Sequence, residues 1–220
     1  MGYHTDFKGG FDCFRAENKE LRAFLSDIRE GNHAALAVLG DWLSEHGDPR
    51  GDKIAKIVAR KTENLSKFWQ MFGLKPEHAA YLKQFAHTRR MRRDAKKLKE
   101  FPDPLREAAG LPVGKEGAYF VGGTGFAGQD RDDSILEYNK PPKGQPSLWC
   151  QWTPNKLGTA IVWDQGEKFY DYVEWLRYLI EHFLAPWEYT LNGEIHWEGE
   201  DERDLGTIVV KDNEVTASYR

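Results

Sequence analysis

The residues EKFYDYVEWLRYLIEHFL, numbered 167–184, carry the strongest secondary-structure signal in this chain. Their apolar side chains recur at the i, i+3, i+4, i+7 spacing of one helix face. The members of this stripe are Phe169, Tyr172, Val173, Leu176, Leu179, Ile180 and Phe183. Pro186 ends the pattern, because proline cannot continue a helix. We predict one helix over residues 167–184 that covers one face of a sheet.

The sheet is predicted from short apolar and aromatic runs on both sides of this helix. The runs cover residues 3–14, 118–121, 147–152, 159–163, 188–198, 207–210 and 214–218. Residues 147–152 and 159–163 are expected to pair as a hairpin, and the last two runs to pair across Asp212-Asn213. Residues 188–198 fit either two strands joined at Asn192-Gly193 or one bent strand. The predicted fold class is α+β, with a mostly antiparallel sheet of five to seven strands.

The segment between the first strand and residue 75 is predicted to be helical. Helical spacing of apolar residues, interrupted by glycine and proline, indicates helices over residues 17–31, 34–46 and 50–72. Asp48 can cap the third of these helices, and Pro49 suits its first turn. Pro76 then opens a further helix that we expect to reach about residue 100, with basic residues around its apolar stripe.

Composition and charge limit the class of protein. A hydrophobic content of 40% and an aromatic content of 13% support a packed core. The net charge of −4 gives no general nucleic-acid signature. Cys13 and Cys150 are too few for a disulfide framework, so we expect buried free thiols. The polar N-terminus and the lack of a long apolar run predict a cytoplasmic protein without a membrane partner.

Residues 37–57, AVLGDWLSEHGDPRGDKIAKI, resemble a short planctomycete module often called the repeat-companion domain. The matching positions are Asp41, Trp42, Leu43, Glu45, His46, Gly47, Asp48, Pro49, Arg50, Gly51 and Ile54. The sequence departs from the module's usual residues at Gly40, Ser44, Asp52 and Lys53. The module has no established activity, so the resemblance implies architecture and lineage, over about residues 20–60, rather than chemistry.

Other segments resemble a family of uncharacterised bacterial and phage proteins. They are residues 2–11, 75–93 and 112–215, and they include EHAAYLKQFAHTRRMRRD, GQPSLWCQW, GEKFYDYVEWLRYLIEHFLAPW and LNGEIHWEGEDERDLGTIVVKDN. That family carries no activity to transfer. Together the two resemblances imply an α+β body of residues 1–13 plus 75–220, with residues 14–74 inserted as a helical module.

Tryptophans set among amides and carboxylates form the strongest candidate site. The residues concerned are Trp149, Gln151, Trp163, Asp164, Glu167 and Tyr170, which surround a predicted hairpin and the start of the following helix. Such a group suits either a packed sheet core or a stacking pocket for a planar or anionic ligand. We expect Trp149 and Gln151 to be at least partly exposed and Trp152 to be buried on the opposite face.

Several other motifs are expected to be structural. Residues 122–125, a glycine-rich run, lack the Lys-Ser/Thr of a phosphate-binding loop. Asp130, Asp132 and Asp133 lack the spacing of a calcium loop. Glu194, His196 and Glu198 alternate with Ile195 and Trp197. We interpret the three polar residues as a solvent-exposed strand face rather than as a metal or acid–base site.

These observations favour a non-enzymatic binding protein that uses the aromatic–amide group to bind a protein or a small ligand, with no cofactor and no metal. One alternative is a small hydrolase-like enzyme with Asp164, Glu167 or His196 as acid–base groups. Another is a nucleic-acid contact through the basic helix 83–99. The missing nucleophile motif and the overall acidity make both alternatives less favoured.

Overall fold

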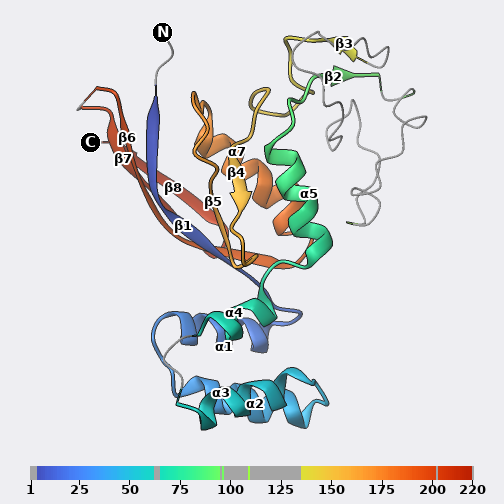
Figure 1. Ribbon diagram of the computed structural model, residues 1–220, viewed down its shortest axis with the longest axis vertical. Helices are drawn as coiled ribbons and strands as arrows, with labels where there is room; N and C mark the ends of the chain where they lie inside the picture. Colours follow the sequence, from blue (N-terminus) through green and yellow to red (C-terminus); the bar gives the residue numbers. More distant parts are fainter. Residues whose placement is uncertain are drawn as a thin grey trace.

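The computed structural model describes residues 4–61, 65–94, 96, 109, 135–201 and 203–219. Its main sheet has six strands in the order β4-β5-β1-β6-β7-β8, and all neighbours are antiparallel (Figure 1). This confirms the predicted α+β fold. The predicted strand 118–121, the glycine-rich run 122–125, and Asp130, Asp132 and Asp133 lie outside the described residues.

The central strand of the sheet is β1. The six strands are β1 (Thr5–Arg15), β4 (Trp152–Pro154), β5 (Ala160–Trp163), β6 (Tyr189–Gly199), β7 (Leu205–Lys211) and β8 (Glu214–Tyr219). A second, small sheet pairs β2 (Arg92–Arg93) with β3 (Ile135–Glu137). Phe11 in β1 is opposite Ile161 in β5, and Phe7 is opposite Trp197 in β6. These side chains therefore meet in the core that the sheet shares with its covering helices.

Two turn predictions have different outcomes. Asp212 and Asn213 have φ angles of 49° and 73° and join β7 to β8, so this hairpin is confirmed. Asn192-Gly193 does not form a turn, because β6 continues through both residues. Of the two predicted alternatives, the single strand is therefore the one observed. Gly193 has φ of 148°, and a Cβ there would lie 2.6 Å from the Gly10 carbonyl oxygen of β1. The absence of a side chain at Gly193 therefore allows β6 and β1 to approach each other closely.

Helices α5 (Pro76–Ala86) and α7 (Tyr172–Leu179) lie on one face of the sheet, and α7 continues into a π-helix over Ile180–Leu184 (Figure 1). The helix predicted over 167–184 therefore begins five residues later than expected. Lys168 and Asp171 have φ angles of 60° and 54°, which a right-handed helix does not allow. Residues 164–171 form a loop between β5 and α7.

The basic helix 83–99 was a wrong prediction. Helix α5 ends at Ala86, where Arg90 turns back so that its Nη1 donates to the carbonyl oxygens of Phe85 and Thr88. Arg89 and Arg90 are buried, so they are not presented to a phosphate backbone. Arg92 belongs to β2 and pairs with Glu137 at 3.2 Å. The helix therefore ends before the predicted apolar stripe does, and the Arg90 side chain is buried over the rings of Phe85 and Trp175.

The helical segment forms its own apolar cluster below the narrow end of the sheet (Figure 1). It contains α1 (Lys19–Arg29), α2 (Ala35–Glu45), α3 (Arg50–Ala59) and α4 (Ser66–Phe72). The motif HGDPRG connects α2 to α3. Within it, Gly47 adopts φ of 70°, and the Asp48 carboxylate accepts from the backbone N–H and the guanidinium of Arg50. Arg50 also forms an ion pair with Glu17 at 3.2 Å. Asp48 and Arg50, which match the repeat-companion pattern, therefore stabilise the connection between α2 and α3.

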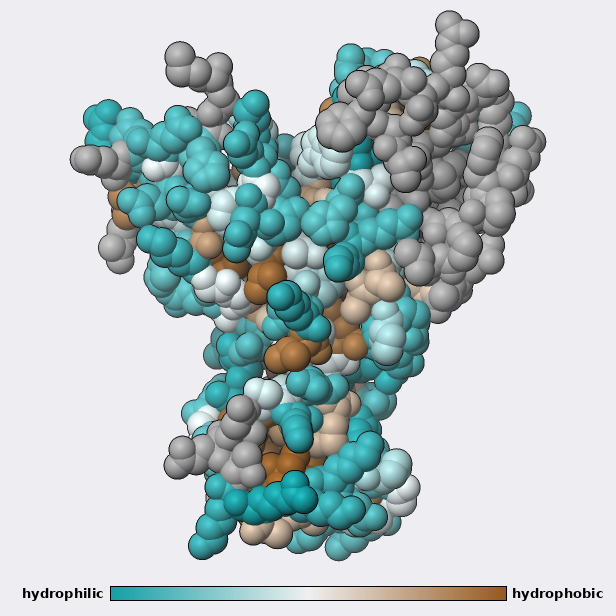
Figure 2. Space-filling model, viewed as in Figure 1, coloured by the Kyte–Doolittle hydropathy of each residue, from teal (hydrophilic) through white to brown (hydrophobic). Residues whose placement is uncertain are grey.

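The two ends of the helical segment meet at the turn between β4 and β5. The Cys13 N–H donates to the Thr159 carbonyl oxygen at 2.8 Å, and the Leu74 N–H donates to that of Gly158 at 2.7 Å. Figure 2 shows apolar side chains reaching the surface at the narrow part of the molecule between the helical segment and the sheet. Phe14 belongs to the helical cluster, while Leu74 belongs to the core of the body.

Because its ends are adjacent, the helical segment is expected to be separable. We predict that replacing residues 17–72 with a short Gly/Ser linker, together with Phe14→Ser to remove an exposed ring, leaves a folded body. Near-ultraviolet circular dichroism during urea unfolding should show one cooperative transition. A product that binds a hydrophobic dye and unfolds without cooperativity would contradict the prediction.

A buried histidine at this junction predicts acid sensitivity. His78 stacks on Trp187 with ring centroids 4.0 Å apart, and its Nδ1 lies 3.1 Å from the Tyr189 hydroxyl. Burial lowers the pKa of His78 to about 4, against 6.5 for an ordinary histidine. The unfolded chain therefore binds a proton in this interval that the folded chain does not, so stability is lost as the pH falls from 6.5 towards 4.

We expect protonation of His78 to lower the unfolding free energy by about 2 kcal/mol as the pH falls from about 8 to about 5. His78→Phe keeps a ring against Trp187 but cannot titrate, so its unfolding free energy should depend less on pH over this range. Urea midpoints of the unmodified chain and of His78→Phe, measured at several pH values, give the difference in stability between the two proteins. The contributions of carboxylates are the same in both proteins and cancel in this difference. Parallel curves for the two proteins would rule out the assignment to His78.

Candidate functional site

Gln151 ties together the strands and the loop of the predicted aromatic–amide group. Its Nε2 donates to the Glu167 carbonyl oxygen at 2.8 Å, and its Oε1 accepts from Trp163 Nε1 at 3.0 Å. Its own carbonyl oxygen accepts from the Asp164 N–H at 3.0 Å. Gln151 is only 8% exposed, so the expectation that it is partly exposed was wrong. The amide is used inside the protein because it satisfies the buried polar groups of the loop.

The loop that Gln151 holds has an unusual backbone. Gln165, Lys168 and Asp171 have φ angles of 67°, 60° and 54°, in the left-handed region that non-glycine residues rarely adopt. The Asp164 Oδ1 accepts from the Gly166 N–H at 2.8 Å and closes the first turn of the loop. Three such residues within one short loop store strain, which persists only where the surrounding contacts fix the conformation.

Trp163 and Asp164 lie at the end of β5, where the loop begins. The half-buried Trp163 ring contacts Phe7 with centroids 5.3 Å apart and lies 6.1 Å from the ring of His4. Burial raises the pKa of the Asp164 carboxyl. His87, just after α5, places its Nδ1 3.8 Å from Asp164 Oδ2. His87 was not predicted, because residues so far apart in sequence meet only through the packing of α5 beside β4.

Trp149 and Tyr170 are the exposed aromatic residues of the group. Trp149 is 42% exposed and Tyr170 is 54% exposed. Trp152, in contrast, is 1% exposed, packs against Phe169 with centroids 5.2 Å apart, and donates through Nε1 to the Tyr172 carbonyl oxygen. The predicted separation of an outer Trp149 from an inner Trp152 is confirmed. Residues 147–151 are irregular, however, rather than the predicted strand.

Two of the acid–base groups of the enzyme alternative, Asp164 and His196, do not converge. His196 is exposed on β6 and pairs with Glu194 at 3.0 Å and with the Thr207 hydroxyl at 3.0 Å. Its neighbours Ile195 and Trp197 are buried, and Trp197 contacts Tyr172 of α7. His196 therefore occupies the face of the sheet that points away from α7. Asp164 lies on the other side, against the end of α5.

Among the described residues, no three His, Cys, Asp or Glu side chains are arranged to hold a metal ion. No helix formed by these residues is both long and apolar enough to cross a membrane. Burial raises the pKa of both Cys13 and Cys150, so these thiols stay protonated.

Comparison of the chain with protein-family models, with curated proteins and with solved structures finds no match. The resemblances to the repeat-companion domain and to the bacterial and phage family therefore stay predictions. What this protein does has to be inferred from its own residues.

Proposed function

We propose that this chain is a non-enzymatic binding protein that engages a protein partner through Trp149 and the loop of residues 164–170. The observation that carries the proposal is the strained loop, which Gln151 fastens to β4 and β5. Residues with strained backbone conformations are often found in binding loops. A loop that is already fixed in one conformation loses less entropy when it binds a partner. Fastening by a buried amide gives the loop that fixed conformation.

The side chains on this surface favour a protein partner. Tryptophan and tyrosine are enriched among the residues that dominate interface affinity, because they bury large area with few rotatable bonds. A small ligand instead needs a pocket that encloses most of its surface. Four of the cavities formed by described residues have volumes of 300–470 Å³, and none of these four is lined by Trp149, Trp163 or Tyr170.

The proposal is tested with paired surface variants of the full chain. We expect Trp149→Ser combined with Tyr170→Ser to weaken the complex isolated from host cells by at least about tenfold, since each side chain is a candidate anchor. Tyr219→Ser is the matched control, because Tyr219 is an exposed tyrosine on β8, at the far edge of the sheet. Quantitative mass spectrometry of co-purified protein is the readout. Equal recovery with both variants would exclude this surface.

A further inference from the structure

The two edge strands of the main sheet, β4 and β8, differ in how open they are. Strand β4 is short and ends at Pro154, which has no N–H to donate to a further strand. Helix α5 also packs beside β4. Strand β8 is longer, and it pairs with β7 over its whole length without a bulge. The edge at β8 is therefore the one suited to pair with another strand.

The hairpin between β7 and β8 decides which backbone groups of β8 bond to β7. In a hairpin with a two-residue turn, the residues that flank the turn form a hydrogen-bonded pair, and every second pair after it is hydrogen-bonded as well. Lys211 and Glu214 flank the turn. Thr216 and Ser218, two and four residues further along β8, therefore direct their backbone groups towards β7.

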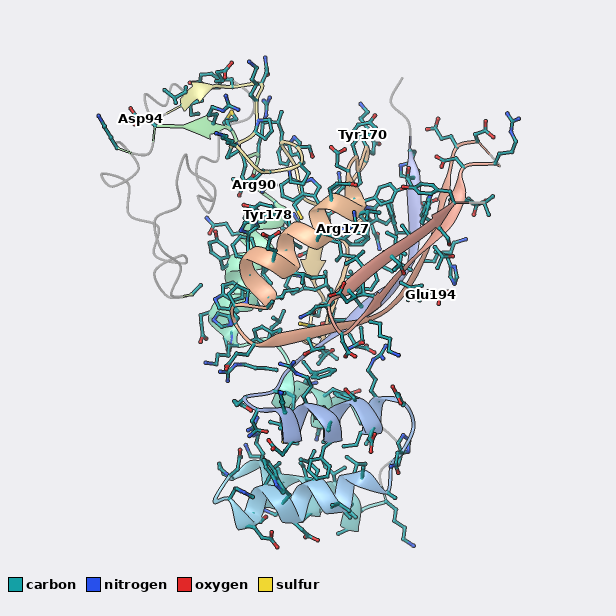
Figure 3. All side chains as sticks on the ribbon, turned by 180° about the vertical axis from the view of Figure 1, so that it is seen from behind. Arg90, Asp94, Tyr170, Arg177, Tyr178 and Glu194 are labelled. Atoms are coloured by element: carbon teal, nitrogen blue, oxygen red, sulfur yellow. The ribbon has the colours of Figure 1, made fainter. Side chains whose placement is uncertain are left out.

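The alternate residues Val215, Ala217 and Tyr219 direct their N–H and carbonyl groups away from the sheet. Arg177 of α7 agrees with this direction, because its Nη2 donates to the Val215 carbonyl oxygen at 3.4 Å. Figure 3 shows Arg177 on α7, beside the outer strands of the sheet. Among the described residues, this long hydrogen bond is the one made to the outward groups of β8. Open backbone groups along a strand edge are a template for a further strand.

The sequence of β8 lacks the features that normally prevent edge pairing. Proteins protect an exposed edge with proline, with charged side chains such as lysine, or with a bulge. Residues 215–219 read VTASY and contain none of these. Tyr219 is also 71% exposed, although its ring contacts the buried Trp197 with centroids 5.2 Å apart. Its outer side is therefore open to a neighbouring side chain.

The hairpin is held in one register by the Asn213 side chain. Asn213 Oδ1 accepts from the Leu191 N–H at 2.7 Å, and Nδ2 donates to the Tyr189 carbonyl oxygen at 3.0 Å. These bonds fasten the turn to β6. An edge that is already fixed loses less entropy when it pairs with another strand.

We propose that β8 pairs antiparallel with β8 of a second copy of this chain, about a two-fold axis at Ala217. This register places the outward groups of Ala217 opposite those of Ala217 in the copy, and those of Val215 opposite those of Tyr219. Each of these pairs exchanges both of its hydrogen bonds. Arg177 releases the Val215 carbonyl oxygen, which then accepts from the Tyr219 N–H of the copy.

The side chains of β8 complement one another in this register. Val215 lies opposite Tyr219 of the copy, a β-branched side chain against an aromatic ring. Thr216 lies opposite Ser218, so that two hydroxyl side chains meet. Both kinds of cross-strand pair stabilise antiparallel sheets, and the small Ala217 falls on the axis. A two-fold interface needs a surface that complements itself in this way, so the sequence of β8 favours a second copy over an unrelated peptide.

The pairing closes after two chains. Each copy uses its β8 edge, and the β4 edge that remains is unsuited to pairing. The interface shares no residue with Trp149 or with the loop of residues 164–170, so it stands or falls independently of the proposed function.

Sedimentation equilibrium of the full chain tests the proposal. A strand pair covers less area than a standard interface, so we expect a monomer–dimer equilibrium with a Kd of about 10–100 μM and no larger species. A monomer at concentrations up to about 1 mM would overturn the proposal in favour of a strand from another protein. Larger species that grow with concentration would overturn the closed pair.

Charged variants locate the interface. Thr216→Lys combined with Ser218→Lys places lysine opposite lysine across the axis. Both residues are exposed, so the variant should fold, and the like charges should weaken self-association at least about tenfold. Mixing this variant with Thr216→Glu combined with Ser218→Glu should restore a dimer, because each lysine then lies opposite a glutamate. Undiminished association of the lysine variant, or no recovery on mixing, would contradict the pairing.

Thr207→Lys combined with Val209→Lys is the matched control. These residues lie on β7 directly opposite Ser218 and Thr216, so the control adds the same charges one strand further from the edge. It should associate as the unmodified chain does. A loss in the control equal to that in the β8 lysine variant would show a general effect of charge and overturn the assignment to β8.

Discussion

Trp152→Ala is expected to cost about 3–5 kcal/mol of unfolding free energy, the range for truncating a fully buried aromatic side chain. The ring contacts Phe7, Phe11 and Phe169, and its Nε1–H donates to a carbonyl oxygen that would lose this bond. The cavity left behind lies under α7, where the rigid sheet cannot collapse to fill it.

Trp149→Ala is the matched comparison, because it removes the same atoms from a partly exposed position three residues away. Surface substitutions of this kind usually change stability by less than about 0.5 kcal/mol. Urea midpoints measured side by side give both values. Equal and large losses would place Trp149 in the core and remove it from the proposed binding surface.

Gly51→Ala is expected to destabilise the helical segment by about 3 kcal/mol or more. A Cβ at Gly51 would lie 2.2 Å from Ser44 Oγ and 2.7 Å from both the Gly40 carbonyl oxygen and the Ser44 backbone nitrogen. The two backbone contacts cannot rotate away, so α2 and α3 have to separate. This loss exceeds the gain of about 1 kcal/mol that alanine brings to a helix.

Gly40→Ala is the control for this prediction. Its Cβ would meet Ile54 Cγ2 at 3.2 Å, a side-chain methyl that can shift by a few tenths of an ångström. We therefore expect a clearly smaller loss for Gly40→Ala in thermal or urea unfolding. A Gly51→Ala protein as stable as the unmodified chain, or less affected than Gly40→Ala, would contradict the described packing of α2 on α3.

The sequence allowed much of the fold to be predicted, because periodicity reports which face of an element is buried. The apolar stripe of α7 and the alternation of Ile195 and Trp197 with polar residues both describe the observed packing. Element ends were predicted less well. An apolar stripe after Pro76, surrounded by basic residues, indicated one long basic helix. The position of Arg90 in the core depends instead on Phe85, Trp175 and Gln145, which come together only in the folded chain.

The candidate site was predicted as a group of residues, without the roles that the structure gives to them. The sequence placed Trp149, Gln151, Trp163 and Asp164 near one another, and the structure joins the last three by hydrogen bonds. The sequence did not indicate that Gln151 is buried, because an amide side chain can lie on the surface or in the interior if its hydrogen bonds are made there. The strained loop was also hidden, since Gln165, Lys168 and Asp171 are not residues that mark positive φ as glycine does.

The central claim is that the loop of residues 164–170 and Trp149 form a surface for a protein partner, and site-specific photo-crosslinking tests it most directly. A photoreactive phenylalanine analogue is placed at position 170 in the full chain and, as the control, at position 219, since both tyrosines are exposed. We predict a discrete adduct from position 170 that is absent from position 219 and is lost on Trp149→Ser. No adduct from position 170, or the same adducts from both positions, would contradict the claim.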